Sequence, residues 1–402
     1  MPSKALILVG GGTRGTRFRP LSLDIPKVLF PVAGKPIVSH AIDAIAGIDS
    51  IKEILLIGFY DDAVFKDFIA DSQKQYPGIS IKYLREYKAM GTAGGLYHFR
   101  DEILKGNPSK FFVIHADVCC SFPLKEIDTL YLEKQAKAVI LGTRVHKDEA
   151  RNYGCIVAEP KTGRVLHYVE KPESKVSNLI NAGVYLFDKT IFDTIAEAKT
   201  ARDEASASRF GDDDQDVLRL EQDVLVRLPQ TGSFYVYETK DFWLQIKTAG
   251  SAVPANSLYL QKLFQANPSA PGLRAPSATI VPPVFVDPSA QVDDSAKLGP
   301  NVSIGPNAKI GAGARVRDSI VLGGVELKHD SVVLNSIVSS DSKVGAWARV
   351  EGTGHHTPAS GAPDGVTILA SNVSVADEVH VQNVLVLPHK EIKTDVKNEV
   401  IM

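Results

Sequence analysis

This chain of 402 residues contains few cysteines and carries little net charge. Its three cysteines, Cys119, Cys120 and Cys155, lack the spacing of a metal site, and an odd count with an adjacent pair argues against a disulfide framework. The formal net charge of −2 gives no electrostatic reason to expect nucleic acid or an anionic membrane as a partner. The sequence also has no signal-peptide core and no apolar run long enough to span a membrane. We therefore expect a cytoplasmic protein with a small ligand.

The N-terminal segment has the composition of a phosphate-binding loop. A short apolar strand over residues 6–9 leads into glycines and basic residues, namely Gly10, Gly11, Gly12, Arg17 and Lys27. Glycine lets backbone N–H groups approach an anion closely, and basic side chains add charge-assisted hydrogen bonds. The dinucleotide fingerprint G-x-G-x-x-G also fits, but it must open a helix directly, and three prolines within residues 20–31 exclude that. The segment therefore indicates a nucleoside triphosphate ligand.

The first part of the chain, residues 1–265, has the pattern of an α/β domain with a mostly parallel sheet, because apolar strands alternate with amphipathic helices. We expect strands over residues 54–57, 81–84, 111–114, 139–143 and 184–187. We expect helices near Pro36, after Gly95, Leu124 and Asp188, and over residues 257–265. Ligands of such sheets lie beyond the carboxyl ends of the strands, which is where Asp117 stands.

The second part, residues 266–402, repeats every six positions. Branched apolar residues recur in one register at Ile280, Val286, Val292, Leu298, Ile304, Ile310 and Val316. This period predicts a left-handed parallel β-helix of hexapeptide repeats, with one apolar side chain per short strand directed inward. The repeat slips after Val316 but persists, and the loop 351–366 interrupts it. That loop is either a surface segment without a specific role or a loop that contacts a partner or regulates the protein.

These features together resemble the sugar-nucleotide pyrophosphorylases, which join a sugar 1-phosphate to a nucleoside triphosphate. Residues 18–22 and 27–34 look most like the GDP-mannose pyrophosphorylases. The resemblance implies nucleotide binding by Gly10, Gly11, Gly12, Gly91, Thr92 and Asp117, and sugar-phosphate binding by Glu170, Lys171, Asn181 and Gly183. It also implies that Arg17 and Lys27 hold the triphosphate as catalytic residues, and that Asp117 is the first ligand of Mg²⁺.

Two departures from the active family change the expected function. The segment 242–246 aligns with one whose fourth residue is an aspartate, the second metal ligand, and this chain has Gln245 there, which offers a carbonyl and no charge. The glycine loop is also two residues longer. Both departures, with the stretches 219–224 and 385–390, resemble the alpha-type GDP-mannose pyrophosphorylases.

The alpha-type resemblance implies a regulatory subunit that binds GDP-mannose or GTP and is weakly active or inactive. It also implies a catalytic beta-type GDP-mannose pyrophosphorylase subunit as partner, in a homo-oligomer or hetero-oligomer. Mg²⁺ would be needed only if the chain is active, and no other cofactor is expected.

Three alternatives stay open at this point. The chain could be an active mannose-1-phosphate guanylyltransferase in which Asp117 alone holds the metal. It could be a hexapeptide-type acyltransferase with His355 and His356 as the general base, or an architectural protein whose β-helix only assembles subunits. Turnover of GTP with mannose 1-phosphate, binding of acetyl-CoA and binding of GDP-mannose distinguish these hypotheses.

Overall fold

The structure is a computed structural model that describes residues 2–10, 16–206, 217–354 and 365–402. Gly11, Gly12, His355 and His356 lie outside these residues. The chain forms two compact units that interleave along the sequence, one of Met1–Arg14 with Val38–Trp243 and one of Gly15–Ile37 with Leu244–Met402. We call them unit 1 and unit 2. The domain boundary expected after residue 265 stays a prediction.

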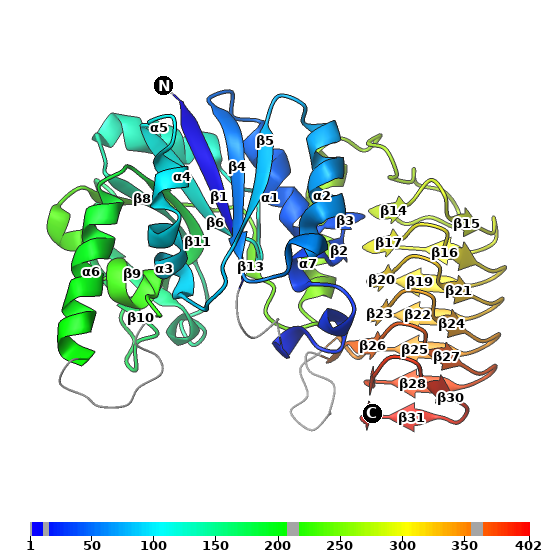
Figure 1. Cartoon of the computed structure of the whole chain (residues 1–402). Coiled ribbons are helices and arrows are strands. Elements are labelled where there is room, and N and C mark those ends of the chain that lie inside the picture. The colour runs from blue at the N-terminus through cyan, green and yellow to red at the C-terminus, as the bar shows by residue number, and fades with distance from the viewer. Residues whose placement is uncertain (1, 11–15, 207–216, 355–364) are drawn as a thin grey trace. The chain divides into compact units, whose positions relative to one another are not determined.

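Unit 1 is built on one sheet (Figure 1). In the described part of the chain nine strands form it. They are β1 (Ser3–Gly10), β4 (Ile51–Gly58), β5 (Ser80–Arg85), β6 (Lys110–His115), β8 (Ala138–Arg144), β9 (Gly154–Ala158), β10 (Val165–Glu170), β11 (Leu179–Phe187) and β12 (Phe234–Glu238). The order β5-β4-β1-β6 is parallel, and β11 continues it antiparallel to β6. The expected α/β architecture is confirmed, with a sheet that is mixed from β11 onward.

The five predicted strands fall within β4, β5, β6, β8 and β11. The central strands β1 and β6 are buried along nearly their whole length, which explains why both read as continuous apolar runs. Beyond the sheet, a short strand β7 (Val118–Cys120) follows β6, and β13 (Trp243–Gln245) stands where the chain passes between the units.

The α-helices assigned mainly to unit 1 are α1 (Ile37–Ala46), α2 (Asp62–Gln75), α3 (Gly91–His98), α4 (Arg100–Leu104), α5 (Leu124–Lys134) and α6 (Ile191–Ser206). Single helical turns lie at Ala150–Asn152, Leu220–Val224 and Leu228–Thr231. The expected starts of α1, α5 and α6 are confirmed to within three residues. In the described residues, no helix combines the length and the apolar character that crossing a membrane requires.

The expected start of α3 was wrong, because the helix begins at Gly91 and not after Gly95. The carbonyl of Leu218 accepts from the N–H groups of Ala93 and Gly94, at 3.0 and 3.2 Å. These amides are among the first of the helix, which have no partner inside it. A carbonyl from a segment more than a hundred residues away therefore permits the earlier start, and the local sequence gives no sign of it.

Unit 2 contains a left-handed parallel β-helix whose short strands stack in register into three sheets (Figure 1). The first sheet is β14 (Val284–Val286), β17 (Val302–Ile304), β20 (Ser319–Val321), β23 (Ser336–Val338), β26 (Thr367–Leu369), β29 (Leu385–Val386) and β32 (Val400–Ile401). The second is β15 (Gln291–Val292), β18 (Lys309–Ile310), β21 (Glu326–Leu327), β24 (Lys343–Val344), β27 (Ser374–Val375) and β30 (Glu391–Ile392). The third is β16 (Lys297–Leu298), β19 (Arg315–Arg317), β22 (Val332–Leu334), β25 (Arg349–Glu351), β28 (His380–Gln382) and β31 (Val396–Lys397).

The six-residue repeat correctly predicted the interior of the β-helix. Val286, Leu298, Ile304, Ile310 and Val316 are buried in one apolar cluster, and Ile280 and Val292 pack against it at the first coil. The number of residues between stacked positions on successive coils also locates the loop inserted into the β-helix. Ile320 pairs with Ile337, but Ile337 pairs with Ile368, so the chain between β25 and β26 carries the extra residues.

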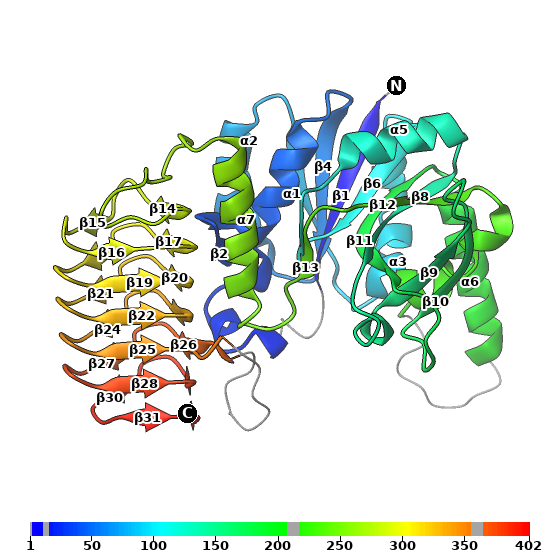
Figure 2. The same cartoon turned by 180° about the vertical axis from the view of Figure 1, so that it is seen from behind.

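The remaining elements of unit 2 cover the outer face of the first sheet. They are α7 (Ala252–Ala266), the helical turns Thr16–Phe18, Leu21–Leu23 and Lys27–Leu29, and the hairpin β2 (Pro31–Val32) with β3 (Lys35–Pro36). Figure 2 shows α7 running beside the coils of the β-helix. On that face Ile320, Ile337 and Ile368 are at most 1% exposed. The Ser371 hydroxyl donates to the Asp24 carboxylate at 2.5 Å, which ties the N-terminal segment to the same face.

One buried amide links three parts of unit 2. The side-chain oxygen of Asn256, in α7, accepts from the Ala33 N–H and from the Ser303 hydroxyl, both at 2.8 Å. Its side-chain nitrogen donates to the Asn301 carbonyl at 3.3 Å. Asn256 is fully buried, so each lost bond would leave a polar group without water.

We expect Asn256→Ala to lower the free energy of unfolding by about 2 to 4 kcal/mol, because it leaves buried donors without acceptors. Urea unfolding followed by far-UV circular dichroism measures the change. Asn267→Ala, at the exposed end of the same helix, is the matched control and should change it by less than about 0.5 kcal/mol. Equal effects of the two substitutions would contradict the linking role of Asn256.

Candidate functional site

The carboxyl ends of β1 and β6 place two predicted nucleotide-binding residues at one edge of the unit 1 sheet. Gly10 ends β1 with φ of +105°, and its carbonyl accepts from the Phe59 N–H at 3.0 Å. Asp117 follows β6 and is half-buried, and the preceding Ala116 N–H donates to the Leu8 carbonyl at 3.0 Å. This is the position that the strand pattern predicted for Asp117.

Gly91 and Thr92 open α3 at the same unit's surface. Gly91 has φ of +74°, and a Cβ there would collide with the Leu218 carbonyl, so only glycine fits. The Thr92 hydroxyl accepts from the Leu220 N–H at 2.9 Å and lies 3.4 Å from a carboxylate oxygen of Glu221. The segment around Leu220 is therefore tied to the first turn of α3.

Glu86 is a candidate residue that the sequence analysis missed. It directly follows β5 and is only 8% exposed, and burial raises the pKa of its carboxyl to about 7. Its carboxylate lies so close to Gly95 of α3 that a Cβ there would collide with it. The rule that selected Asp117, an acid just past a strand of a parallel sheet, also selects Glu86.

A partly buried ion pair joins the turn Leu220–Val224 to the end of β6. The Nε2 atom of His115 lies 3.0 Å from a carboxylate oxygen of Glu221. Burial alone would raise the pKa of Glu221, but hydrogen bonding and the charge of His115 outweigh it and hold that pKa below its ordinary value. Glu221 is therefore ionised, next to Thr92, and its partner His115 lies two residues before Asp117 in the sequence. Glu221 lies in the stretch 219–224 that carries part of the resemblance, but its sequence context alone indicates no role for it.

The predicted sugar-phosphate residues lie on β10 and β11 of the same sheet. The side-chain nitrogen of Asn181 donates to the hydroxyls of Tyr185 and Tyr168, at 2.8 and 3.1 Å. The Tyr168 hydroxyl donates to Glu170 at 2.9 Å. The Asn181 oxygen accepts from the Gly183 N–H at 2.9 Å. The structure thus brings Glu170, Asn181 and Gly183 together through hydrogen bonds.

Lys171 stands at the end of this group and is exposed. Its ammonium lies 3.6 Å from the Glu170 carboxylate. Its backbone N–H donates to the Tyr153 carbonyl at 3.2 Å. Lys171 has φ of +45°, an uncommon conformation for a residue other than glycine. An exposed ammonium can receive a phosphate, and this role of Lys171 stays a prediction.

Arg17 and Lys27 belong to unit 2. Arg17 is exposed in the turn Thr16–Phe18, and the neighbouring Phe18 is buried against Phe30, with ring centroids 5.3 Å apart. The Lys27 ammonium donates to the Ile246 carbonyl at 3.2 Å. The buried aromatic pair therefore anchors a segment whose basic side chains stay near the surface.

Gln245 is half-buried in unit 2, beside a cavity of about 520 Å³. Lys247, Ser251 and Asp318 also line this cavity. Asp318 accepts from the Asn301 amide at 2.8 Å and lies 3.4 Å from Arg317, so its carboxylate is already engaged. Within the residues that the structure describes, no group of three His, Cys, Asp or Glu side chains is placed to hold a metal ion.

The predicted Mg²⁺ site can be tested against this donor set. Mg²⁺ is usually held by one or two carboxylates together with substrate phosphates. In unit 1, Asp117 supplies one half-buried carboxylate, which fits an ion that phosphates would mostly hold. Gln245, in unit 2, has an uncharged amide oxygen at the position where the resemblance puts the second ligand.

Family comparison covers almost the whole chain. Residues 4–259 match the nucleotidyl transferase family, and residues 280–402 match the GMPPB C-terminal domain. A protein of Schizosaccharomyces pombe named "Probable mannose-1-phosphate guanyltransferase" is 50% identical, over 100% of both chains. A Dictyostelium discoideum protein named "Mannose-1-phosphate guanylyltransferase regulatory subunit alpha" is 46% identical, over 100% of this chain and 99% of its own.

Solved structures agree on the fold of the first part. A UDP-glucose pyrophosphorylase structure with UDP-glucose bound has a TM-score of 0.52 and 23% identity, covering 65% of this chain and 100% of that one. A glucose-1-phosphate thymidylyltransferase structure from Bacillus anthracis has a TM-score of 0.51 and 22% identity, covering 64% of this chain and 94% of that one. At this identity the likeness shows a shared fold.

Proposed function

Because the chain belongs to the mannose-1-phosphate guanylyltransferase family, we propose that it binds GDP-mannose and regulates a catalytic subunit of that family, with little or no guanylyl transfer of its own. The observation that carries the proposal is Gln245, an amide at the position where the resemblance puts the second metal-binding carboxylate. Relatives from Dictyostelium discoideum and Xenopus tropicalis that are 46% and 47% identical are named as regulatory subunits alpha, which supports a catalytic partner.

The described residues offer binding groups for each part of GDP-mannose. The buried Glu86 carboxylate beside α3 is an acceptor for the two N–H donors on the edge of guanine. Lys171 would pair with the phosphate on the sugar side, and Glu170 with sugar hydroxyls. Arg17 and Lys27 would neutralise further phosphate charge.

Turnover needs more than binding. When the oxygen of mannose 1-phosphate attacks the α-phosphorus of GTP, pyrophosphate leaves and negative charge gathers on the phosphates. Mg²⁺, when bound, neutralises that charge. Asp117 would be the single carboxylate that holds the ion, since the resemblance puts an uncharged amide, Gln245, at the position of the second ligand. Losing one such electrostatic contact typically costs about 2.7 to 4 kcal/mol in the transition state, or roughly 10² to 10³ in rate.

An active enzyme is the second candidate function. Asp117 is present at the end of β6, and the Schizosaccharomyces pombe relative carries the name of a guanyltransferase. In that case phosphates would hold the metal with Asp117 alone, as Mg²⁺ sites with a single carboxylate do.

Calorimetry and a turnover assay on the purified chain test the proposal together. We expect GDP-mannose to bind and the chain to turn over GTP and mannose 1-phosphate at least about a hundredfold more slowly than the enzyme median near roughly 10 s⁻¹. Turnover within about tenfold of that median would establish the active enzyme instead. Absence of any GDP-mannose binding would favour a purely architectural role.

A further inference from the structure

Trp347 breaks the pattern of its corner in the β-helix. It has φ of +61°, in the left-handed region, and its side chain is 59% exposed. The neighbouring coils have Gly313, Asp330 and Glu378 at the stacked positions, with φ of +68°, +57° and +66°. Glycine and aspartate tolerate this conformation, whereas for longer or bulkier side chains such as Glu378 and Trp347 it costs roughly 1 to 2 kcal/mol. The indole therefore costs stability and buries little of its own apolar surface.

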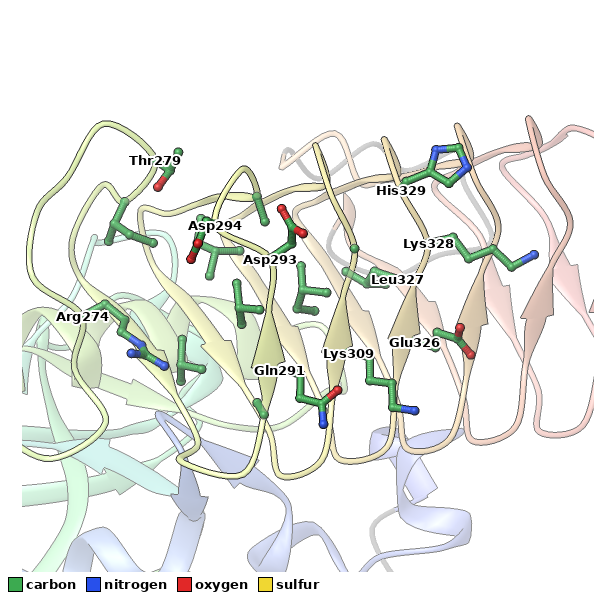
Figure 3. Close-up of a pocket in the computed structure, with 18 of the residues that line it drawn as sticks. Arg274, Thr279, Gln291, Asp293, Asp294, Lys309, Glu326, Leu327, Lys328 and His329 are labelled. Carbon is green, nitrogen blue, oxygen red and sulfur yellow. The ribbon is translucent and has the colours of Figure 1, made fainter.

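The surroundings of Trp347 are acidic. His329 packs its ring edge against the indole at 6.4 Å between centroids, and pairs with Asp330 at 3.1 Å. Asp377 accepts from the Ala346 N–H at 2.8 Å and from Lys328 at 3.1 Å, and Glu378 beside it is exposed. Figure 3 shows Asp293 and Asp294 on the same corner as His329, further toward the first coil. We call the set His329, Asp330, Trp347, Asp377 and Glu378 the Trp347 corner.

The adjoining third sheet has the opposite character. Its outward side chains include four exposed basic residues on β16, β19 and β25, and we call these the basic strip: Lys297, Arg315, Arg317 and Arg349. Within the same coils, Arg349 also pairs with Glu351 and Arg317 with Asp318. Val332 pairs with Arg315 on one side and with Arg349 on the other, and it is only half-buried. Val332, which lies between the guanidinium groups of Arg315 and Arg349, can therefore pack against an indole, because arginine stacks on aromatic faces.

We propose that the Trp347 corner and the basic strip form a self-complementary surface through which two copies of this chain associate about a two-fold axis. In such an interface, residue i of one copy meets residue j of the other, and j meets i. The acidic corner of each copy then faces the basic strip of its partner, and each Trp347 packs over Val332 between Arg315 and Arg349. Exposed aromatic residues surrounded by charged rims are typical of the residues that dominate binding energy.

Trp347→Asn separates this role from folding. Asparagine accepts the left-handed conformation, so the folded-to-unfolded ratio of the monomer should rise by about 5-fold or more. Self-association should weaken by about tenfold or more, because the anchoring side chain is lost. Sedimentation velocity over a concentration series measures the association, and urea unfolding at a concentration where the chain is monomeric measures the stability.

Charge reversal tests the pairing of the two surfaces. Arg315→Glu should weaken the dimer, and adding Glu378→Lys should recover part of the loss, because the signs are exchanged across the interface. Lys309→Glu is the matched control, since Lys309 is an exposed cation of the same coil on the second sheet (Figure 3). Lys309→Glu should leave the association unchanged. In a separate measurement, added salt should weaken the wild-type dimer, because salt screens the charges across the interface.

Three results would overturn the proposal. One is a wild-type chain that stays monomeric at about 100 µM, a concentration at which even a weak specific dimer forms. The second is a dimer that Trp347→Asn and Arg315→Glu leave intact. The third is the loss, in these variants, of binding to a catalytic subunit while self-association persists, which would assign the surface to that partner. None of these results depends on whether the chain binds GDP-mannose.

Discussion

Guanylyl transfer should rise by about 10² to 10³-fold when Gln245 is replaced by aspartate, provided that the missing carboxylate is what limits the chain. The substitution places a negative charge at the position where the resemblance expects the second metal ligand. A divalent ion held from two sides neutralises the charge that develops on the phosphates. Release of pyrophosphate from GTP with mannose 1-phosphate and Mg²⁺, followed by a coupled assay, measures the gain.

Gln245→Asn is the matched control for this experiment. It shortens the side chain by the same amount and adds no charge, so turnover should stay at the wild-type level. The glycine loop is a second departure, two residues longer than in the active family, and deletion of Thr13 and Arg14 can be combined with Gln245→Asp. If the combined variant still shows no transfer, the missing charge is not the reason for low activity.

Glu86→Gln should weaken GDP-mannose binding by about 10²-fold, because the amide can accept only one of the two hydrogen bonds that guanine donates and carries no charge. The carboxylate accepts both, and charge-assisted bonds are about twice as strong as neutral ones. Calorimetry with GDP-mannose measures the loss. Glu53→Gln, which removes a charge from the ion pairs with Lys4 and Lys82 at the other end of the same sheet, is the control and should leave binding unchanged.

The pH dependence of binding tests the same residue. Burial raises the pKa of Glu86 to about 7, so the carboxyl gains its charge as the pH rises through that value. Guanine needs acceptors, and therefore the ionised form. We expect affinity for GDP-mannose to rise by up to about tenfold between pH 6 and 8, and Glu86→Gln to abolish this rise. An affinity that falls over this range, or the same profile in the variant, would exclude Glu86 as the receptor for the base.

Much of the fold was readable from the sequence because its signals are local. The six-residue spacing from Ile280 to Val316 predicted the interior of the β-helix, because each short strand directs one apolar side chain inward and six residues separate successive strands. Strands β4 and β6 were found from apolar runs that are buried on both faces over most of their length. The start of α3 was missed because its cap is the distant Leu218 carbonyl.

Only part of the candidate site could be predicted from the sequence, because some of its residues depend on neighbours that are distant along the chain. Asp117 stood out because it follows a strong apolar strand. Glu221 did not, since its meaning depends on His115, which lies more than a hundred residues earlier in the chain. Trp347 has an ordinary sequence context, and only its backbone angle and exposure mark it as unusual.

The sequence by itself determined the two architectures, the family of the chain and the amide at position 245, because each of these is written in the order and spacing of residues. Only the tertiary structure decided which side chains are buried and what they meet. Burial gives Glu86 its raised pKa and the pairing with His115 keeps Glu221 ionised, and both effects arise from neighbours that folding brings together. Electrostatic and packing energies depend on distance in space, which the spacing of residues along a chain does not specify.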